Sequence, residues 1–370
     1  MKITIVGGGL GGLTLARVLR VHGVESTVYE LDGSPTARDQ GGTLDMHGES
    51  GQRALREAGL FDQFRAVARD EGEAMRLMDG KGVVYVDDVA PEPGGRPEVD
   101  RSALKRILVE SLPAGAVRWG AKVTAVTPSS VTVDGEIIES DLVVGADGAW
   151  SKVRPLLSDA RPVYSGLSFV ELHLSDVDAQ HPDAAAFVGP GSMFALDHGK
   201  GVMAQRNGDG RIRVYLAIRA EDEGWVATEL VDPADPVQTR LRLLEIFDDF
   251  AAPLRGLIAD ADEAFVPRAI HALPVGHRWP RVPGVTLLGD AAHLMSPFAG
   301  EGANLAMLDA AELALALAAT GTTGAVEDAL ATYEAAMFPR AEQAAYASAT
   351  NLVECFEPGG AQRLAGFMGG

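Results

Sequence analysis

The chain of 370 residues has a single cysteine, Cys355, and only 6% aromatic residues. One cysteine excludes an internal disulfide framework and fits a reducing compartment. Basic residues are also scarce: 32 Lys and Arg stand against 52 Asp and Glu, which gives a formal net charge of −20. Because nucleic acid and anionic membrane would repel such a protein, neither is an expected partner.

Long apolar runs are absent as well. The stretch MKITIVGGGLGG is too short for the apolar core of a signal peptide, and ELALALAAT (312–320) falls well short of a membrane span. The eight histidines are scattered and form no cluster with ligand spacing, so no metal site is expected. We therefore expect a soluble, cytoplasmic protein.

A length of 370 residues allows one large or two medium domains, and a hydrophobic fraction of 46% with 43 glycines fits a globular protein with many tight turns. KITIV (2–6), a glycine turn, LTLARVLRVHG and STVYE (26–30) predict strand, turn, helix and strand, the first unit of a parallel α/β sheet. Helical patterns follow at 50–68 and 100–112, and buried strands are expected in DLVVG and GVTLLGD.

The middle of the chain differs in character. Residues 192–219 predict three strands joined by glycine-containing turns, with no helices between them. We therefore predict a separate antiparallel lobe, followed by long helices that are interrupted at 320–324 and bent or broken at Pro339. The predicted domains are 1–160 with a return at 276–325, a sheet domain at 161–275, and a C-terminal helix at 326–370.

The first chemical motif is Gly7-x-Gly9-x-x-Gly12, which lies between a predicted strand and a predicted helix. Gly7 permits the turn, Gly9 lets a pyrophosphate approach the backbone, and Gly12 allows the helix to pack on the strand. Glu30 ends the second strand, where its carboxylate can accept hydrogen bonds from an adenosine ribose. This arrangement predicts dinucleotide binding, and the alternative is a glycine-rich packing turn.

Two further motifs favour FAD over NAD. GADG, with Asp147 and Gly148, ends one strand, and LLGDAAH, with Gly289 and Asp290, ends another. Because the carboxyl ends of strands line the ligand crevice of such a sheet, both aspartates can face one long cofactor. A nicotinamide cofactor on one Rossmann unit would not need the late Gly–Asp pair.

These motifs, with GDAAHLMSPFAGEGAN (289–304), resemble the fingerprints of FAD-dependent aromatic hydroxylases of the para-hydroxybenzoate hydroxylase type, and their order matches along essentially the whole chain. GGTLDMHGESGQRALREAGLFDQF (41–64) resembles the tetracycline-inactivating branch more closely. The resemblance implies a Rossmann-type FAD-binding domain of α/β class, a mainly antiparallel substrate domain and a long C-terminal bridging helix. It implies FAD as cofactor, NADPH as co-substrate, and no second nucleotide domain.

The resemblance also implies roles for individual residues. Asp290 would accept hydrogen bonds from the ribityl hydroxyls. The turn that follows it would aim backbone N–H groups and a helix N-terminus at the flavin pyrimidine; its expected contributors are Pro297, Gly300, Gly302 and Asn304. Arg38, Asp45 and Arg101 match positions that contact FAD, and surface ion pairs are the alternative for each. Leu31 stands where many relatives have arginine. His293 is expected to pack or to form hydrogen bonds. A P-loop is not indicated, because its Gly-Lys-Ser/Thr ending is missing.

The implied reaction needs no side-chain nucleophile. NADPH reduces FAD, O₂ adds to the reduced ring, and a flavin hydroperoxide delivers one oxygen atom to an electron-rich carbon. Glu171 and Ser192 stand where the tetracycline-inactivating enzymes have glutamine and arginine, and Arg213 is the candidate for compensating charge. By resemblance, the positions that line the substrate pocket are Glu171, Ser192, Phe194, Arg213, Tyr215, Phe298 and Asn351.

Three functions remain open at this point. The first is hydroxylation of a polycyclic aromatic or polyketide-like substrate, with tetracyclines as one candidate. The second is hydroxylation of a small aromatic acid or phenol. The third is flavin and ligand binding without turnover. The alanine-rich segment 331–356 suits either a helix that ties two lobes together in a monomer or a dimerisation helix, and we favour the tie.

Overall fold

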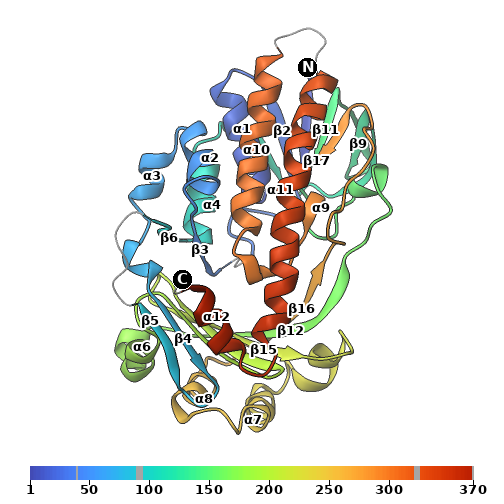
Figure 1. The fold of residues 1–370 in the computed structure, drawn as a ribbon. Helices are drawn as coiled ribbons and strands as arrows, with labels where there is room; N and C mark the ends of the chain where they lie inside the picture. Colours follow the sequence, from blue (N-terminus) through green and yellow to red (C-terminus); the bar gives the residue numbers. More distant parts are fainter. Residues whose placement is uncertain (39–40, 89–94, 321–325, 369–370) are drawn as a thin grey trace. The chain divides into compact units, whose positions relative to one another are not determined.

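Figure 1 shows the fold in a computed structural model, which describes residues 1–38, 41–88, 95–320 and 326–368. The chain divides into two compact units, and each is described by itself. The first unit comprises Met1–Ala68, Arg101–Val163 and His271–Ala349. The second comprises Arg69–Asp100, Tyr164–Ile270 and Thr350–Gly370.

A parallel sheet of five strands forms the centre of the first unit. Its order is β17-β11-β1-β2-β7, and every neighbouring pair is parallel. The chain moves outward from β1 through β2 to β7 and returns on the other side of β1 with β11 and β17, so a switch point lies between β1 and β11. Ligands bind at such points, beyond the carboxyl ends of the strands. The strands are β1 (Ile3–Val6), β2 (Ser26–Glu30), β7 (Val117–Trp119), β11 (Leu142–Gly145) and β17 (Val285–Leu287).

Helices α1 (Leu10–Val21) and α10 (Gly302–Ala319) lie side by side in this unit (Figure 1). Close packing is possible because Gly11 has no side chain: a Cβ there would lie 2.6 Å from Leu288 Cδ1 and 3.1 Å from the Ala306 carbonyl oxygen. The other elements of this unit are β3 (Thr43–Asp45), α2 (Gly51–Glu57), α3 (Phe61–Arg65), α4 (Arg101–Glu110), β8 (Val123–Thr127), β9 (Ser130–Val133), β10 (Glu136–Glu139), η2 (Arg154–Leu156), α9 (Asp290–His293) and η4 (Pro297–Ala299).

The apolar run 312–320 belongs almost entirely to α10. By length and composition this helix could cross a membrane, since its 18 residues have a mean hydropathy of 1.4, and 56% of them are buried. A helix in a protein core passes the same test, so the composition of α10 is weak evidence for a membrane span.

A sheet of seven strands forms the second unit, in the order β16-β12-β15-β14-β13-β4-β5. All neighbours whose pairing is described are antiparallel except β13 and β4, which run parallel. Its strands are β4 (Met75–Asp79), β5 (Val84–Asp88), β12 (Val163–Leu174), β13 (Ser192–Asp197), β14 (Lys200–Arg206), β15 (Ile212–Arg219) and β16 (Val266–Ala272).

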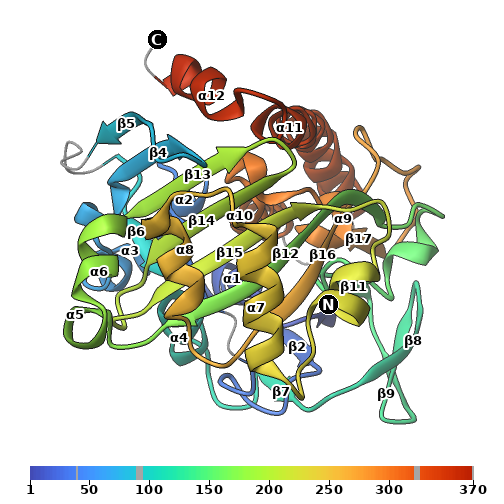
Figure 2. The same cartoon turned by 90° about the horizontal axis from the view of Figure 1, so that it is seen from below.

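One face of this sheet packs against helices. Val170, Leu172, Val214 and Leu216 are fully buried and form a core with apolar residues of α7 and α8, which lie across the strands in Figure 2. The remaining elements are η1 (Asp70–Glu73), β6 (Glu98–Asp100), α5 (Val177–Gln180), α6 (Pro182–Val188), the π-helical turn η3 (Val226–Leu230), α7 (Pro236–Ile246), α8 (Ala252–Ala259) and α12 (Gly360–Met368).

The three strands expected within 192–219 are present. The predicted domain boundaries, however, differ from the structure at residues 69–100. That segment was assigned to the first domain, whereas β4 pairs with β13 inside the second unit. Pairing between segments far apart in sequence leaves no local periodicity that could have indicated it. The helical pattern 50–68 is two helices, α2 and α3, because Gly59 between them has φ +65°.

Of the predicted bend or break at Pro339, the structure shows no break. Helix α11 (Val326–Cys355) continues through this residue. A proline inside a helix costs about 3 kcal/mol, and here the helix persists with Met337 and Ala341 on either side buried. Residues of α11 up to Ala349 belong to the first unit and those from Thr350 to the second. The interruption expected at 320–324 falls almost entirely outside the described residues.

Gly191→Ala is expected to destabilise the second unit. A Cβ at Gly191 would lie 2.1 Å from the carbonyl oxygen of Ala74, where β13 meets β4. Because backbone must move, the free energy of unfolding should fall by about 2–3 kcal/mol. Gly256→Ala is the matched control, since Gly256 lies in α8 with nothing within 4 Å of a Cβ, and it should stabilise by about 0.5–1 kcal/mol. Equal urea midpoints for the two variants would contradict this account.

Candidate functional site

The turn between β1 and α1 is built from glycines that the packing requires. A Cβ on Gly7, whose φ is +105°, would lie 2.3 Å from the carbonyl oxygen of Ala146, and one on Gly12 would lie 2.0 Å from the carbonyl oxygen of Gly7. Gly9 differs, because nothing lies within 4 Å of its Cβ position and no side chain caps the helix that it begins. The α1 N-terminus is therefore open to an anion.

Glu30 holds this turn at the end of β2. The side chain is buried; Oε2 accepts a hydrogen bond from the Gly8 N–H at 2.5 Å, and Oε1 accepts one from the Asp32 N–H at 2.8 Å. Each carboxylate oxygen can accept a second hydrogen bond. Glu30 therefore orients the glycine turn, and its carboxylate can still accept the predicted hydrogen bonds from a ribose.

Asp147 follows β11, across the switch point from Gly7. Its Oδ2 accepts a hydrogen bond from the Lys152 N–H at 2.6 Å, while its buried Oδ1 has no hydrogen-bond partner among the described residues. Burial raises the pKa of this carboxyl group, against hydrogen bonds from Ser151 and from backbone groups. An unpartnered buried acceptor is costly, and it suits a ligand that supplies a donor.

Sequence reasoning missed Arg154, which joins two of the three motifs. Its guanidinium is buried and donates to the Ala291 carbonyl from Nε at 2.8 Å, and to the Ala149 carbonyl from Nη2 at 2.7 Å. Burial lowers its pKa, although the carboxylates of Asp147 and Asp290 act in the opposite direction. The signal was an arginine seven residues after Asp147 in the same fingerprint.

Asp290 begins α9 directly after Gly289, whose φ is +58°, and its side chain is exposed. It lies at the carboxyl end of β17, as predicted, and is available to a ligand. The following loop contains Pro297 in η4, Gly300 with φ +67°, and Gly302 at the start of α10. A helix of 18 residues therefore begins at this edge of the sheet.

Asn304, a predicted flavin contact, has a side chain that also holds neighbouring segments of the protein together. Oδ1 accepts a hydrogen bond from the His47 N–H at 3.0 Å, and Nδ2 donates to the Asp45 carbonyl at 2.8 Å. The amide thus ties the segment after β3 to α10. A Cβ on Gly51 would lie 2.3 Å from its Oδ1, which shows how closely α2 approaches.

His47, which the sequence did not single out, lies in the same cluster. Its Nε2 is 2.8 Å from Asp45 Oδ2, and its Nδ1 is 3.2 Å from Glu301 Oε1. Asp45 also lies against Gly300, where a Cβ would be 3.6 Å from its carboxylate oxygens. Segment 45–47 and loop 300–304 are therefore joined by charge as well as by the amide of Asn304.

The other two predicted FAD contacts lie near the end of β2 and at the start of α4. Arg38 is 64% exposed and forms an ion pair with Asp32 at 2.6 Å, the alternative considered from the sequence. Arg101 donates its backbone N–H to the Gly42 carbonyl at 3.1 Å. Lys105 of α4 was missed: it is buried, and its ammonium lies 4.0 Å from Asp32 Oδ2 and 5.6 Å from the Trp119 ring centroid.

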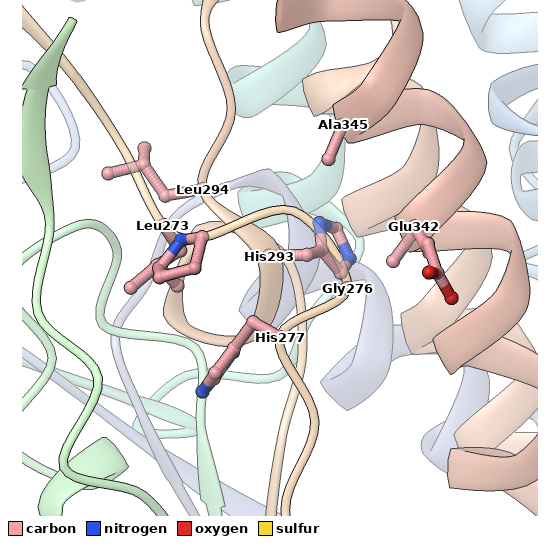
Figure 3. Close-up of a pocket in the computed structure, with 9 residues that line it drawn as sticks. Leu273, Gly276, His277, His293, Leu294, Glu342 and Ala345 are labelled. Carbon is pink, nitrogen blue, oxygen red and sulfur yellow. The ribbon is translucent and has the colours of Figure 1, made fainter.

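His293 has the packing and hydrogen-bonding role that we expected. It is buried, with Nε2 2.5 Å from Asp309 Oδ2, and Arg340 binds the other oxygen of that carboxylate at 2.8 Å. Although burial opposes its charge, Asp309 raises the pKa of His293. The cavity that His293 lines with Leu273, His277 and Glu342 (Figure 3) has a volume of about 10 Å³. It is the size of a water molecule and is no substrate site.

Five of the predicted substrate residues share one face of the seven-stranded sheet. Strand register places Phe194, Tyr215 and Glu171 in one row across the sheet, and Ser192 and Arg213 in the next. Their sequence neighbours point to the opposite, helix-covered face. Phe298 belongs to η4 in the first unit and Asn351 to the last turn of α11, so neither is part of this sheet.

Charge and aromatic rings meet on this face. The carboxylate of Glu171 accepts hydrogen bonds from Arg213 Nη1 and from Arg268 Nε, the latter at 2.5 Å. Glu171 and Arg213 are buried, whereas Arg268 is 50% exposed. The Phe169 and Tyr215 rings lie beside them with centroids 5.7 Å apart. Arg213, the expected source of compensating charge, thus forms an ion pair with Glu171. The second positive charge of the cluster belongs to Arg268, which the sequence did not indicate.

Comparison with known proteins identifies the family. The model of the family described as FAD binding domain matches residues 1–348. Monooxygenase penA of Penicillium thymicola is 32% identical, covering 98% of this chain and 97% of its own. The chain belongs to the FAD-dependent monooxygenases.

Solved structures share the fold of this monooxygenase. Klebsiella pneumoniae HpxO, complexed with FAD and uric acid, superposes with a TM-score of 0.78 at 24% identity, covering 100% of this chain and 95% of that one. Tetracycline destructase Tet(51) superposes with a TM-score of 0.70 at 20% identity, covering 96% and 91%. At these identities the likeness shows the fold alone.

FAD fits the first unit of the monooxygenase on observations from its own residues. The α1 N-terminus is open at Gly9, a buried oxygen of Asp147 has no partner among the described residues, and Asp290 is exposed at the next strand end. All three lie at the carboxyl edge of the parallel sheet. Bound there, FAD would supply the redox chemistry, while these residues bind and orient it.

Substitutions of Gly9 and Gly12 should have different effects on FAD binding and on the stability of the apoprotein. Gly9→Ala adds a methyl group to open space, so the apoprotein should lose only about 0.5–1 kcal/mol at this helix cap, while the FAD dissociation constant should rise about tenfold or more. Gly12→Ala forces a methyl group onto the Gly7 carbonyl and should cost about 3 kcal/mol of apoprotein stability. Urea unfolding and FAD titration of both variants test this; similar apoprotein stabilities would contradict it.

Arg154→Met should weaken the junction of the two aspartate-bearing turns. The substitution leaves the Ala149 and Ala291 carbonyls without their buried donor, so the free energy of unfolding should fall by about 2–4 kcal/mol. Arg118→Met, at an exposed position on β7, is the matched control and should change stability by less than about 0.5 kcal/mol. Unfolding of the apoproteins measures both; an Arg154→Met protein as stable as the control would refute the assignment.

Proposed function

We propose that this monooxygenase consumes NADPH and O₂ to hydroxylate a polycyclic aromatic or polyketide-like substrate, with tetracyclines as one candidate. The observation that carries the proposal is the sheet face in the second unit that bears aromatic rings and a shared Glu171–Arg213–Arg268 cluster. A flavin monooxygenase must hold an electron-rich ring in a defined orientation, since positioning is much of what the protein contributes.

The residues of this face suit such a ring. Phe194 and Tyr215 lie in one row across the sheet with Glu171 and offer apolar and edge contacts to an aromatic substrate. Two guanidinium groups share a single carboxylate, so the cluster has a net positive charge. Positive charge favours the phenolate or enolate form of a substrate oxygen, which makes the attached ring carbon more electron-rich.

A second candidate, hydroxylation of a small aromatic acid or phenol, draws on the same charge. The fold neighbour HpxO was solved with uric acid, whereas Tet(51) is a tetracycline destructase. A small anionic substrate could place its charged group at Arg268, while a polycyclic one would also extend along the aromatic row. The size of the accepted substrate distinguishes the two.

The first test measures cofactor consumption by the FAD-loaded protein in air, with NADPH and NADH in parallel, and the mass of any product. Consumption stimulated by a tetracycline, with a product heavier by one oxygen atom, supports the first candidate. The same result with a hydroxybenzoate alone supports the second. Hydrogen peroxide as the sole product would mean that the compound binds but is badly oriented. Stimulation by no aromatic compound at all would count against both.

Arg268→Gln should weaken the binding of the substrate found in this way. Losing a charge-assisted hydrogen bond should raise KM about tenfold with a smaller effect on kcat. Arg242→Gln is the matched control, because Arg242 lies in α7 on the helix-covered side and binds the Glu229 carbonyl. Steady-state kinetics on both variants test the assignment, which an unchanged KM for Arg268→Gln would contradict.

A further inference from the structure

Both ring nitrogens of His47 face carboxylates. The side chain is 2% exposed, Nε2 lies 2.8 Å from Asp45 on β3, and Nδ1 lies 3.2 Å from Glu301 just before α10. A neutral imidazole can donate from only one nitrogen, and an ionised carboxylate only accepts. Nε2 is hydrogen-bonded to Asp45, whereas Nδ1 approaches Glu301 at ion-pair distance without the geometry of a hydrogen bond. Both contacts are attractive together when the ring is protonated, so the geometry favours an imidazolium.

The electrostatics agree with this geometry. Burial disfavours the charged ring, but the nearby carboxylates of Asp45 and Glu301 outweigh it and raise the pKa of His47 from 6.5 to about 9. Within the described residues, these two carboxylates are the charged groups that act on the ring. The neighbouring side chains from the helices are neutral amides: Asn304 of α10, which binds the His47 N–H, and Gln52 of α2, which binds the Met46 carbonyl.

The cluster connects two segments that are far apart in sequence. The Gln52 N–H of α2 donates to the His47 carbonyl at 3.0 Å, and Asn304 binds both His47 and Asp45. The loop that contains Gly300 and Glu301 leads into the α10 N-terminus. It therefore lies at the edge where the open helix, Asp147 and Asp290 mark the cofactor site.

We propose that His47 is a positioning residue that, as an imidazolium, joins Asp45 to Glu301 and neutralises their charge beside the flavin-binding loop. This inference rests on the proposed function, since it places FAD at this edge of the sheet. Without the proton, two carboxylates repel each other across the junction of segment 45–47 and loop 300–304. The site then binds FAD less tightly and carries more negative charge, which disfavours the addition of electrons to the flavin.

The direction of the pH dependence follows from the raised pKa. Because folded His47 holds its proton more tightly than an ordinary histidine, the cluster stabilises the folded protein fully below about pH 6.5, and this contribution is lost as the pH rises through about 9. The difference between wild-type protein and a variant without the imidazole should therefore be large at pH 7 and small above pH 9.

The test uses His47→Gln in the full-length protein, with FAD as the probe and no substrate. At pH 7 the variant should have a FAD dissociation constant about tenfold higher and a lower flavin midpoint potential than wild type, and both differences should vanish above pH 9. His22→Gln, an exposed histidine at the end of α1, is the matched control and should behave as wild type at every pH.

Glu301→Gln keeps the imidazole and removes one carboxylate, so it tests the inference even if His47→Gln does not fold. Its midpoint potential should rise above that of wild type, and the inflection with pH should move below pH 9. The double variant should return the potential toward wild type. If His47→Gln and Glu301→Gln match the His22→Gln control in both readouts, the inference fails. If the control itself binds no FAD, the proposed function fails instead.

Discussion

The guanidinium of Arg154 lies where the two returning strands of the parallel sheet end, and much of the cofactor site depends on it. It donates to carbonyl groups of the turn after β11 and of the turn after β17, which places Asp147 and Asp290 on a common edge. On the other side of the switch point, Gly7 fits against the Ala146 carbonyl with no room for a methyl group. Three turns from distant parts of the sequence are thus held close together. A side chain shorter than Arg154 would not reach both carbonyl groups, and a residue larger than Gly7 would not fit against Ala146.

Several cationic side chains are buried with a specific partner. Arg213 is buried against Glu171, and the buried Arg154 donates to backbone carbonyl groups. His293 and Arg340 bind the two oxygens of the fully buried Asp309. Because a buried carboxylate without a partner is costly, these pairs fix which segments lie together. At the loop before α10 the burial is reversed, since His47 is buried between two partly exposed carboxylates.

The two units contain different types of sheet, and each type suits a different kind of binding surface. The parallel sheet gathers strand ends at one edge, which suits a long cofactor that needs several backbone turns. The antiparallel sheet of the second unit alternates its side chains, so that one face packs on helices and the other carries Phe194, Tyr215 and Glu171 in one row. Side chains on the face that we propose for the substrate can therefore vary without disturbing the apolar core on the other.

The sequence by itself determined the elements whose signals are local. Gly7-x-Gly9-x-x-Gly12 between a strand and a helix, Glu30 at a strand end, and the two later aspartate turns were sufficient to predict a Rossmann-type FAD site. The alternation in 192–219 was sufficient to predict three strands, because side chains of a strand alternate with a period of two.

Tertiary structure alone decided the pairings over long range. It placed β4 beside β13, engaged the side chain of Asn304 with segment 45–47, and brought His47 between Asp45 and Glu301. It also paired Arg213 with Glu171 and added Arg268. Charge pairs and strand partners depend on distances in space between residues far apart in the chain, and no periodicity or short motif records those distances.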